Sequence, residues 1–137
     1  QSGATQIDAL RANYEAAGVQ AELTPFIEDT ATAFADADII VCRAGASTVT
    51  EIAAVGAAAI FVPFPSAVDD HQTTNAQFLV DAGGGWLVQQ RDLTPEGLSQ
   101  MLLKLERPAL VDIALKAKNM QKINATREVV TACEELA

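Results

Sequence analysis

Hydrophobic positions along the chain follow two spacings, one typical of buried strands and one typical of helices. The change from one to the other is sharpest between Asp38 and Glu51. Four apolar residues, 39–42, are followed by a turn that contains Gly45 and then by a helical pattern. Ser47 or Thr48 is the candidate cap of that helix. The stretch predicts a strand, a tight turn and a helix in direct succession.

The same two patterns recur along the rest of the chain, with Gly and Pro at most boundaries. Strands are predicted over 19–24, 39–42, 58–62 and 86–88. In the first half of the chain, helices are predicted from about Ile7 to Gly18, from Asp29 or Thr30 to Ala37, and over 48–55. In the second half they are predicted from about residue 70 to Ala82, from Thr94 to Leu105, from Pro108 to Met120, and around Val129–Leu136. Phe78 and Leu79 are expected on the buried face of the helix that begins near residue 70. Strands that alternate with helices predict an α/β fold, a doubly wound parallel sheet with helices on both faces.

The turn at Gly45 is a candidate ligand site. Ligands of parallel α/β sheets bind outside the carboxyl ends of the strands, where a helix N-terminus offers unpaired N–H groups to a phosphate. Glu51 lies about one turn into the helix, and its carboxylate suits a neutral diol such as a ribose. Thr48 and Glu51 fit a capping box equally well, which would stabilise the helix with no ligand present.

A second polar cluster follows the predicted strand 58–62. Pro63 and Pro65 end this strand, and Asp69, Asp70, His71, Gln72 and Asn75 follow where a helix begins. The two aspartates are typical complements of a helix dipole and are interpreted as structural. The uncharged donors and acceptors suit the hydroxyl groups of a sugar. His71 is the only histidine, and without a nucleophile motif it is not assigned as a catalytic base.

Phe26 and Ile27 are two large apolar residues where a loop is expected. They either plug the core or form one wall of a pocket for a flat ring. In the second case the backbone of Ile27 could pair with the edge of a base. The sequence leaves both interpretations open.

Composition narrows the class of ligand. At 137 residues the chain suits one domain, and its formal net charge of −9 argues against nucleic acid or an anionic membrane as a partner. A phosphorylated small molecule stays compatible, because backbone N–H groups can hold it. Cys42 and Cys133 are interpreted as reduced core thiols, and no metal-binding spacing, signal peptide or membrane-spanning run is present. Because the first residue is Gln1, we expect a piece of a longer polypeptide.

Taken together, the loops resemble the carboxyl-terminal domain of the MurG family, the lipid I N-acetylglucosaminyltransferases of peptidoglycan synthesis, which are GT-B glycosyltransferases. The resemblance covers essentially the whole chain. It rests on five spaced motifs: Gln1-Ser2-Gly3, Pro25-Phe26-Ile27, Cys42-Arg43-Ala44-Gly45-Ala46 through Glu51, Val62-Pro63-Phe64-Pro65, and Asp69-Asp70-His71-Gln72-Thr73-Thr74-Asn75-Ala76.

The resemblance implies a site for UDP-N-acetylglucosamine, with no cofactor and no metal. The Ile27 backbone would read the uracil beside Phe26, and Glu51 would hold the ribose. The remaining implied ligands face the diphosphate and the sugar, and these are Arg43, Gly45, Ala46, His71, Gln72 and Asn75. Some relatives carry another glutamine at the position of His71 and many carry leucine at that of Ser47, so the chain departs from the family pattern at these two positions.

The resemblance also implies what lies outside the chain. Family members have an amino-terminal domain with the lipid I site, the proposed base and a membrane-association patch, and their carboxyl domain begins with a strand and a glycine-rich loop. We therefore expect this chain to be inactive alone, and the complete enzyme to lie peripherally on the cytoplasmic side of the bacterial inner membrane. The complete enzyme would transfer N-acetylglucosamine with inversion.

Two alternatives remain from the sequence. A UDP-N-acetylglucosamine 2-epimerase shares this architecture and a comparable strand-to-helix unit. A non-catalytic donor-binding half that acts with a separate subunit belongs to another functional class.

Overall fold

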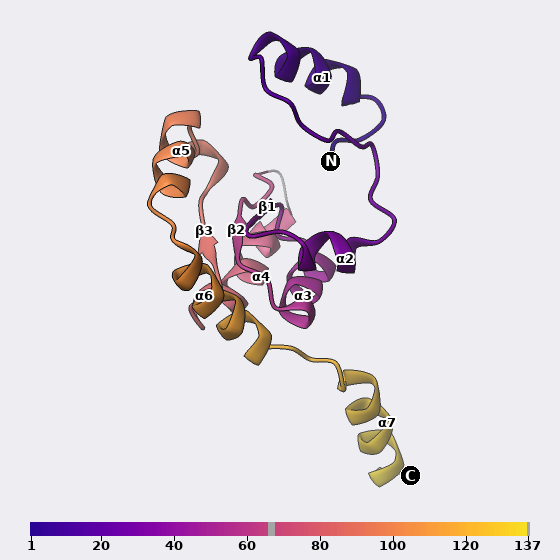
Figure 1. The fold of residues 1–137 in the computed structure, drawn as a ribbon. Coiled ribbons are helices and arrows are strands. Elements are labelled where there is room, and N and C mark those ends of the chain that lie inside the picture. The colour runs from indigo at the N-terminus through magenta and orange to yellow at the C-terminus, as the bar shows by residue number, and fades with distance from the viewer. Residues whose placement is uncertain (66–67, 137) are drawn as a thin grey trace. The chain divides into compact units, whose positions relative to one another are not determined.

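A computed structural model of the chain describes residues 1–65 and 68–136. The chain divides into two compact units, Gln1–Ala33 and Phe34–Ala137. Figure 1 shows the helices and strands of each. None of the helices in the described ranges combines the length and the apolar character needed to cross a bilayer.

The first unit contains one helix and an extended segment. Helix α1, Ile7–Ala16, is followed by Gly18 at a φ of +67°, so the predicted helix and its glycine stop are confirmed. The strand predicted over 19–24 is wrong. Thr24 accepts one backbone hydrogen bond from Ser2 (3.1 Å), but no ladder forms along the segment. Alternating hydrophobicity predicts a strand only where a second strand lies alongside, and this unit offers a helix instead.

Phe26 and Ile27 lie in a turn of the first unit. The N–H of Phe26 donates to Thr24 Oγ1 (3.3 Å), and Gln1 Nε2 donates to the Pro25 carbonyl (3.3 Å). Phe26 is 68% exposed and Ile27 is half-buried. Phe26 therefore does not plug a core, and the pocket-wall interpretation stays a prediction.

Helix α2, Thr30–Ala35, begins where the sequence predicts and ends two residues before the expected Ala37. Asp29 caps it, because its carboxylate accepts from the Thr32 N–H (2.9 Å) and the Thr32 hydroxyl (2.7 Å). These bonds, first the one from the backbone N–H, lower the pKa of Asp29 below its ordinary value.

The second unit is built on a three-stranded parallel sheet. Strands β1, Ile40–Cys42, β2, Ala59–Phe61, and β3, Trp86–Leu87, lie in the order β1-β2-β3. Ile40 pairs with Ala59, and Ile60 pairs with Trp86. All residues of β2 are buried, as its continuous apolar run predicts for a central parallel strand. The predicted strands 39–42, 58–62 and 86–88 are thus confirmed, within one or two residues at their ends.

The helices after β1 are α3, Ala46–Val55; α4, His71–Val80, after the short 3₁₀ helix η1, Val68–Asp70; α5, Pro95–Leu103, after the 3₁₀ helix η2, Gln90–Asp92; α6, Arg107–Asn119; and α7, Ala125–Glu135 (Figure 1). Helices α3, α4 and α6 contribute buried residues to the core, whereas no residue of α5 or α7 is buried. Helix α3 packs against both α4 and α6. The core contains Ile52, Ile60, Phe61 and Leu79, all fully buried.

Two apolar residues differ from their predicted burial. Phe78 is 37% exposed, because α4 buries Ala76 and Leu79 instead. Cys133 is exposed, because no residue of α7 is buried, so its interpretation as a core thiol is wrong.

The turn from α4 to β3 requires glycines for close approach as well as for a stop. A Cβ on Gly84 would lie 2.9 Å from the backbone of Ala117 in α6, and one on Gly85 would lie 2.7 Å from the Ala59 carbonyl oxygen. Gly83, at a φ of +75°, supplies the left-handed residue after the helix. The three glycines let α6 and β2 pass directly against the turn that leads into β3.

Helix α5 offers a direct test of a predicted cap. The Thr94 hydroxyl accepts from the Gly97 N–H (3.0 Å) and Pro95 is the first helical residue, as predicted. We expect Thr94→Ala to lower the free energy of unfolding by about 1 kcal/mol, measured by urea denaturation. Thr94→Ser keeps the hydroxyl oxygen that accepts the bond, so its free energy of unfolding should fall by less than half as much. Equal losses for both variants would contradict the capping role.

Candidate functional site

The turn between β1 and α3 presents a helix N-terminus at the carboxyl end of the sheet. Gly45 is the N-cap, with extended backbone at φ −62° and ψ 147°, and the Val49 N–H donates to its carbonyl (3.0 Å). Helix α3 thus begins at Ala46, two residues before the predicted start at Thr48. The predicted caps Ser47 and Thr48 lie inside the first turn, and no side chain caps the helix. Its first N–H groups can therefore serve an anion.

Glu51 is the sixth residue of α3, in its second turn, and is exposed. Because Gly45 is the N-cap, Thr48 and Glu51 do not occupy the N-cap and N3 positions of a capping box. The capping interpretation of Glu51 is wrong. Glu51 thus stands on the helix whose N-terminus faces the strand ends, as the diol-binding interpretation requires.

Two side chains of α4 hold the peptide groups of Ala44. Gln72 Oε1 accepts from the Ala44 N–H (3.3 Å), and Asn75 Nδ2 donates to the Ala44 carbonyl (3.1 Å). Gln72 and Asn75 are three residues apart, so they lie on one face of the helix. Ala44 is fully buried, so these bonds satisfy polar backbone groups that water does not reach. The pair fixes the residue that precedes the Gly45 N-cap.

Gln72 also joins the loop after β2. Its Oε1 accepts a second bond, from the Phe64 N–H (2.9 Å). One side-chain oxygen therefore receives N–H groups from the loops that follow β1 and β2. The carbonyl of Gln72 is committed to the protein, and the Nε2 amide is the part of the side chain that could serve a sugar hydroxyl.

Arg43 connects the same two loops through its guanidinium. Its Nη1 donates to the carbonyls of Val62 and Pro63 (3.2 Å each), and its guanidinium lies 5.5 Å from the centroid of the Phe64 ring. The structure gives this predicted ligand a loop-bridging role. Its charge stays at the carboxyl end of the sheet, where it favours an anion in a chain of net charge −9.

The residues before α4 adopt an uncommon backbone. Asp69 and Asp70 have φ values of +55° and +51°, and Asp70 is the N-cap of the helix. Asp70 Oδ1 accepts from the Thr73 hydroxyl (2.7 Å), and its place at the N-terminus of α4 is the one predicted for a complement of the helix dipole. His71 is the first residue of α4 and is exposed.

The structure thus brings part of the predicted site together. Arg43, Gly45, Ala46, Gln72 and Asn75 form one cluster around the loops after β1 and β2. Phe26 and Ile27 belong to the first unit, and their part in the site stays a prediction. Sequence reasoning missed Ala44, which contributes its backbone N–H and carbonyl, and Phe64, which contributes its N–H and its ring. The sequence signal for such contacts is the three-residue spacing of Gln72 and Asn75, which places both side chains on one face of α4.

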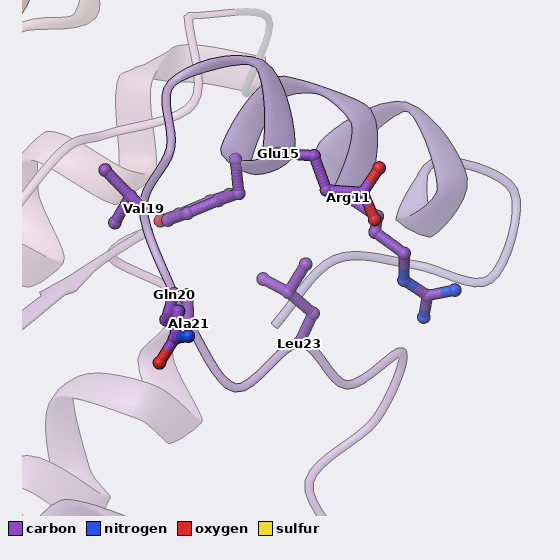
Figure 2. A pocket seen from close by; sticks show the side chains of 7 residues that line it. Arg11, Glu15, Val19, Gln20, Ala21 and Leu23 are labelled. Atoms are coloured by element: carbon purple, nitrogen blue, oxygen red, sulfur yellow. The ribbon is translucent and has the colours of Figure 1, made fainter.

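The first unit contains an open cavity of about 520 Å³ between α1 and the segment that follows it (Figure 2). Glu15 and Arg11 line it from the helix, and Val19 and Leu23 line it from the extended segment. A smaller cavity of about 150 Å³ in the second unit lies beside the Arg107–Asp38 ion pair (3.1 Å). Neither cavity is lined by a predicted binding residue, so we base the candidate site on the loop cluster.

The cluster offers no nucleophile. Burial raises the pKa of the Cys42 thiol to about 11, so the thiol stays protonated near neutral pH. No group of three or more His, Cys, Asp or Glu residues is placed to hold a metal within residues 1–65 and 68–136. The chemistry that the cluster does offer is hydrogen bonding and dipolar stabilisation of an anion.

Comparison with known proteins identifies the family. The model of the glycosyltransferase family 28 C-terminal domain matches residues 1–133. The chain belongs to this family. A crystal structure of MurG from Acinetobacter baumannii is similar to the chain, with a TM-score of 0.91 and 46% identity over 98% of this chain and 42% of that one. The predicted fold class, a parallel α/β domain of the GT-B carboxyl-terminal type, is confirmed.

Curated relatives of the family 28 domain carry one name. Proteins of Paracidovorax citrulli and Polaromonas naphthalenivorans are each 79% identical over 99% and 100% of the chain, and one of Cupriavidus necator is 60% identical over 100%. All three are named UDP-N-acetylglucosamine–N-acetylmuramyl-(pentapeptide) pyrophosphoryl-undecaprenol N-acetylglucosamine transferase. The chain spans 38% of the length of each of these relatives.

Proposed function

We propose that residues 1–137 form the UDP-N-acetylglucosamine-binding domain of an inverting transferase that converts lipid I to lipid II. The observation that carries the proposal is the α3 N-terminus at Gly45 and Ala46, which Gln72 and Asn75 hold at the carboxyl end of the sheet. The names of the relatives specify the same donor and a lipid-linked acceptor. Family membership over nearly the whole chain supports the assignment.

The donor would extend along the loops. The Ile27 backbone and Phe26 would receive the uracil, Glu51 the ribose hydroxyls, and Gly45 and Ala46 the diphosphate. His71 and the Gln72 Nε2 amide would reach the sugar hydroxyls, with Asn75 and Arg43 supporting the loops. The committed carbonyl of Gln72 restricts it to donating toward the sugar.

The chemistry expected of these residues is orientation and leaving-group stabilisation. In the reaction, the 4-hydroxyl of the acceptor's muramoyl sugar attacks the anomeric carbon of the donor, and UDP leaves. The N–H groups of the first turn of α3 stabilise the negative charge that develops on the diphosphate as the glycosidic bond breaks. We assign the acceptor site, the base and the membrane contact to parts of the protein outside this domain. The complete enzyme would lie on the cytoplasmic face of the inner membrane. We expect the domain alone to be inactive.

Incubation of the full-length protein with UDP-N-acetylglucosamine and lipid I tests the proposal. We expect UDP and the lipid-linked disaccharide to form in equal amounts. A 2-epimerase would release UDP without a disaccharide, and that result would overturn the assignment. The names of the relatives favour the transferase. A non-catalytic half would show donor binding without product until a separate subunit is added.

A further inference from the structure

A second hydrogen-bonded chain reaches α4 from the opposite edge of the sheet. Gln89 Nε2 donates to Thr73 Oγ1 (3.0 Å), and the Thr73 hydroxyl donates to Asp70 Oδ1 (2.7 Å). The direction follows from the groups, because an amide nitrogen only donates and an ionised carboxylate only accepts. Thr73 and Gln89 are both half-buried, which reduces competition from water.

The hydrogen bonds from Gln89 through Thr73 to Asp70 complete the attachment of the first turn of α4 to the sheet. Gln89 lies just beyond β3, whose ladder continues with a bond from the Val88 N–H to the Phe61 carbonyl (2.9 Å). Gln72 and Asn75 join the same turn to the loops after β1 and β2. The α4 N-terminus is therefore tied to the carboxyl ends of all three strands.

This series of hydrogen bonds ends on Asp70, whose backbone conformation needs support from neighbouring groups. Asp69 and Asp70 both have positive φ, which is uncommon for residues other than glycine and persists only where neighbouring groups hold it. The Thr73 hydroxyl holds the carboxylate of Asp70. Because His71 and Gln72 follow directly, the backbone at Asp70 sets the direction in which their side chains leave the helix.

We propose that Thr73 and Gln89 are positioning residues that set the affinity of the site for the sugar part of its ligand. The inference rests on the proposed function and deepens it. Neither residue needs to touch the donor. Their hydrogen bonds keep the turn at Asp70 in the conformation that directs His71 and Gln72 toward the sugar, while the ribose and the diphosphate are bound elsewhere, through α3.

The test compares binding of UDP and UDP-N-acetylglucosamine to the full-length protein by titration calorimetry, well below its melting temperature. We expect Thr73→Val and Gln89→Met each to raise the Kd for UDP-N-acetylglucosamine about 3- to 10-fold, while the Kd for UDP changes less than about 2-fold. The double variant should lose little more than either single variant, because both remove the same chain.

Two controls separate positioning from general destabilisation. Thr73→Ser keeps the hydroxyl and should restore sugar-nucleotide affinity. Thr74→Val makes the same substitution at the exposed neighbouring residue of α4 and should leave both Kd values unchanged. If Thr73→Val unfolds the protein, Gln89→Met and Thr73→Ser still test the inference. The first should raise the Kd for UDP-N-acetylglucosamine and the second should not.

Equal changes for both ligands, or additive losses in the double variant, would overturn the inference while leaving the proposed function intact. Absence of sugar-nucleotide binding by the unsubstituted protein would instead remove the proposed function, and the inference with it.

Discussion

Replacing Glu51 by alanine in the full-length protein should weaken UDP binding by about 1.5–3 kcal/mol, the range for hydrogen bonds to a charged group. Glu51 is exposed on the second turn of α3, and the Gly45 N-cap removes its alternative role in a capping box. We expect the loss of the carboxylate to lower UDP affinity, and the melting temperature measured alongside reports any loss of contacts within the protein. Calorimetric titration with UDP measures the change directly.

The control for this prediction is a carboxylate in a helix remote in sequence from the candidate site. Glu96→Ala, in the first turn of α5, should leave UDP affinity unchanged. Glu51→Gln keeps one acceptor oxygen and should fall between the wild type and Glu51→Ala. A fall in melting temperature for Glu51→Ala with unchanged UDP affinity would show that the residue supports its helix and not a ribose.

Gln72→Ala should both destabilise the fold and weaken sugar binding. The substitution leaves the N–H of the fully buried Ala44 without its acceptor, which costs about 1–3 kcal/mol of unfolding free energy. The exposed Phe64 N–H can be satisfied by water and should add little. Urea denaturation measures the stability, and titration with UDP and UDP-N-acetylglucosamine measures the two affinities.

Gln72→Glu separates the two roles of this side chain. A carboxylate still accepts from both N–H groups but has no amide to donate, so stability should be largely kept while affinity for the sugar nucleotide falls. We expect UDP affinity to be nearly retained in both variants. Equal losses for UDP and the sugar nucleotide would exclude Gln72 from the sugar site, and unchanged stability of Gln72→Ala would contradict the Ala44 contact.

The order of elements in the second unit could be predicted because its signals are local. Residues 39–42 and 58–62 are continuous apolar runs of strand length, and Gly56 and Pro63 mark the ends of the elements beside them. Thr94 with Pro95 marks a helix start in the same way. In these cases the neighbouring residues alone determine the backbone.

The errors arise where a pattern needs a partner from elsewhere in the chain. The alternation over 19–24 describes one face of an extended segment but not a strand to pair with it. The start of α3 was misplaced because Thr48 is the better cap by residue type, whereas Gly45 takes the position through its backbone. Residue type alone favours Thr48 as the N-cap, whereas the path of the backbone out of β1 places Gly45 there.

The sequence predicts which polar residues gather near the α4 N-terminus but not the backbone groups that they contact. Gln72 and Asn75 were identified as a polar cluster at the α4 N-terminus, and they lie there. Their bonds to Ala44 span 28 and 31 residues, a separation that no local pattern reports. The sequence likewise does not predict the bonds from Arg43 Nη1 to the carbonyls of Val62 and Pro63, and the role of Arg43 toward a ligand stays a prediction.

A crystal structure of the full-length protein with bound UDP-N-acetylglucosamine tests the central claim most directly. We predict the diphosphate at the N-terminus of α3 beside Gly45 and Ala46, the ribose hydroxyls on Glu51, the uracil at the Ile27 backbone, and the sugar at His71 and Gln72. Density for the nucleotide away from the α3 N-terminus, with Glu51 facing solvent, would contradict the account.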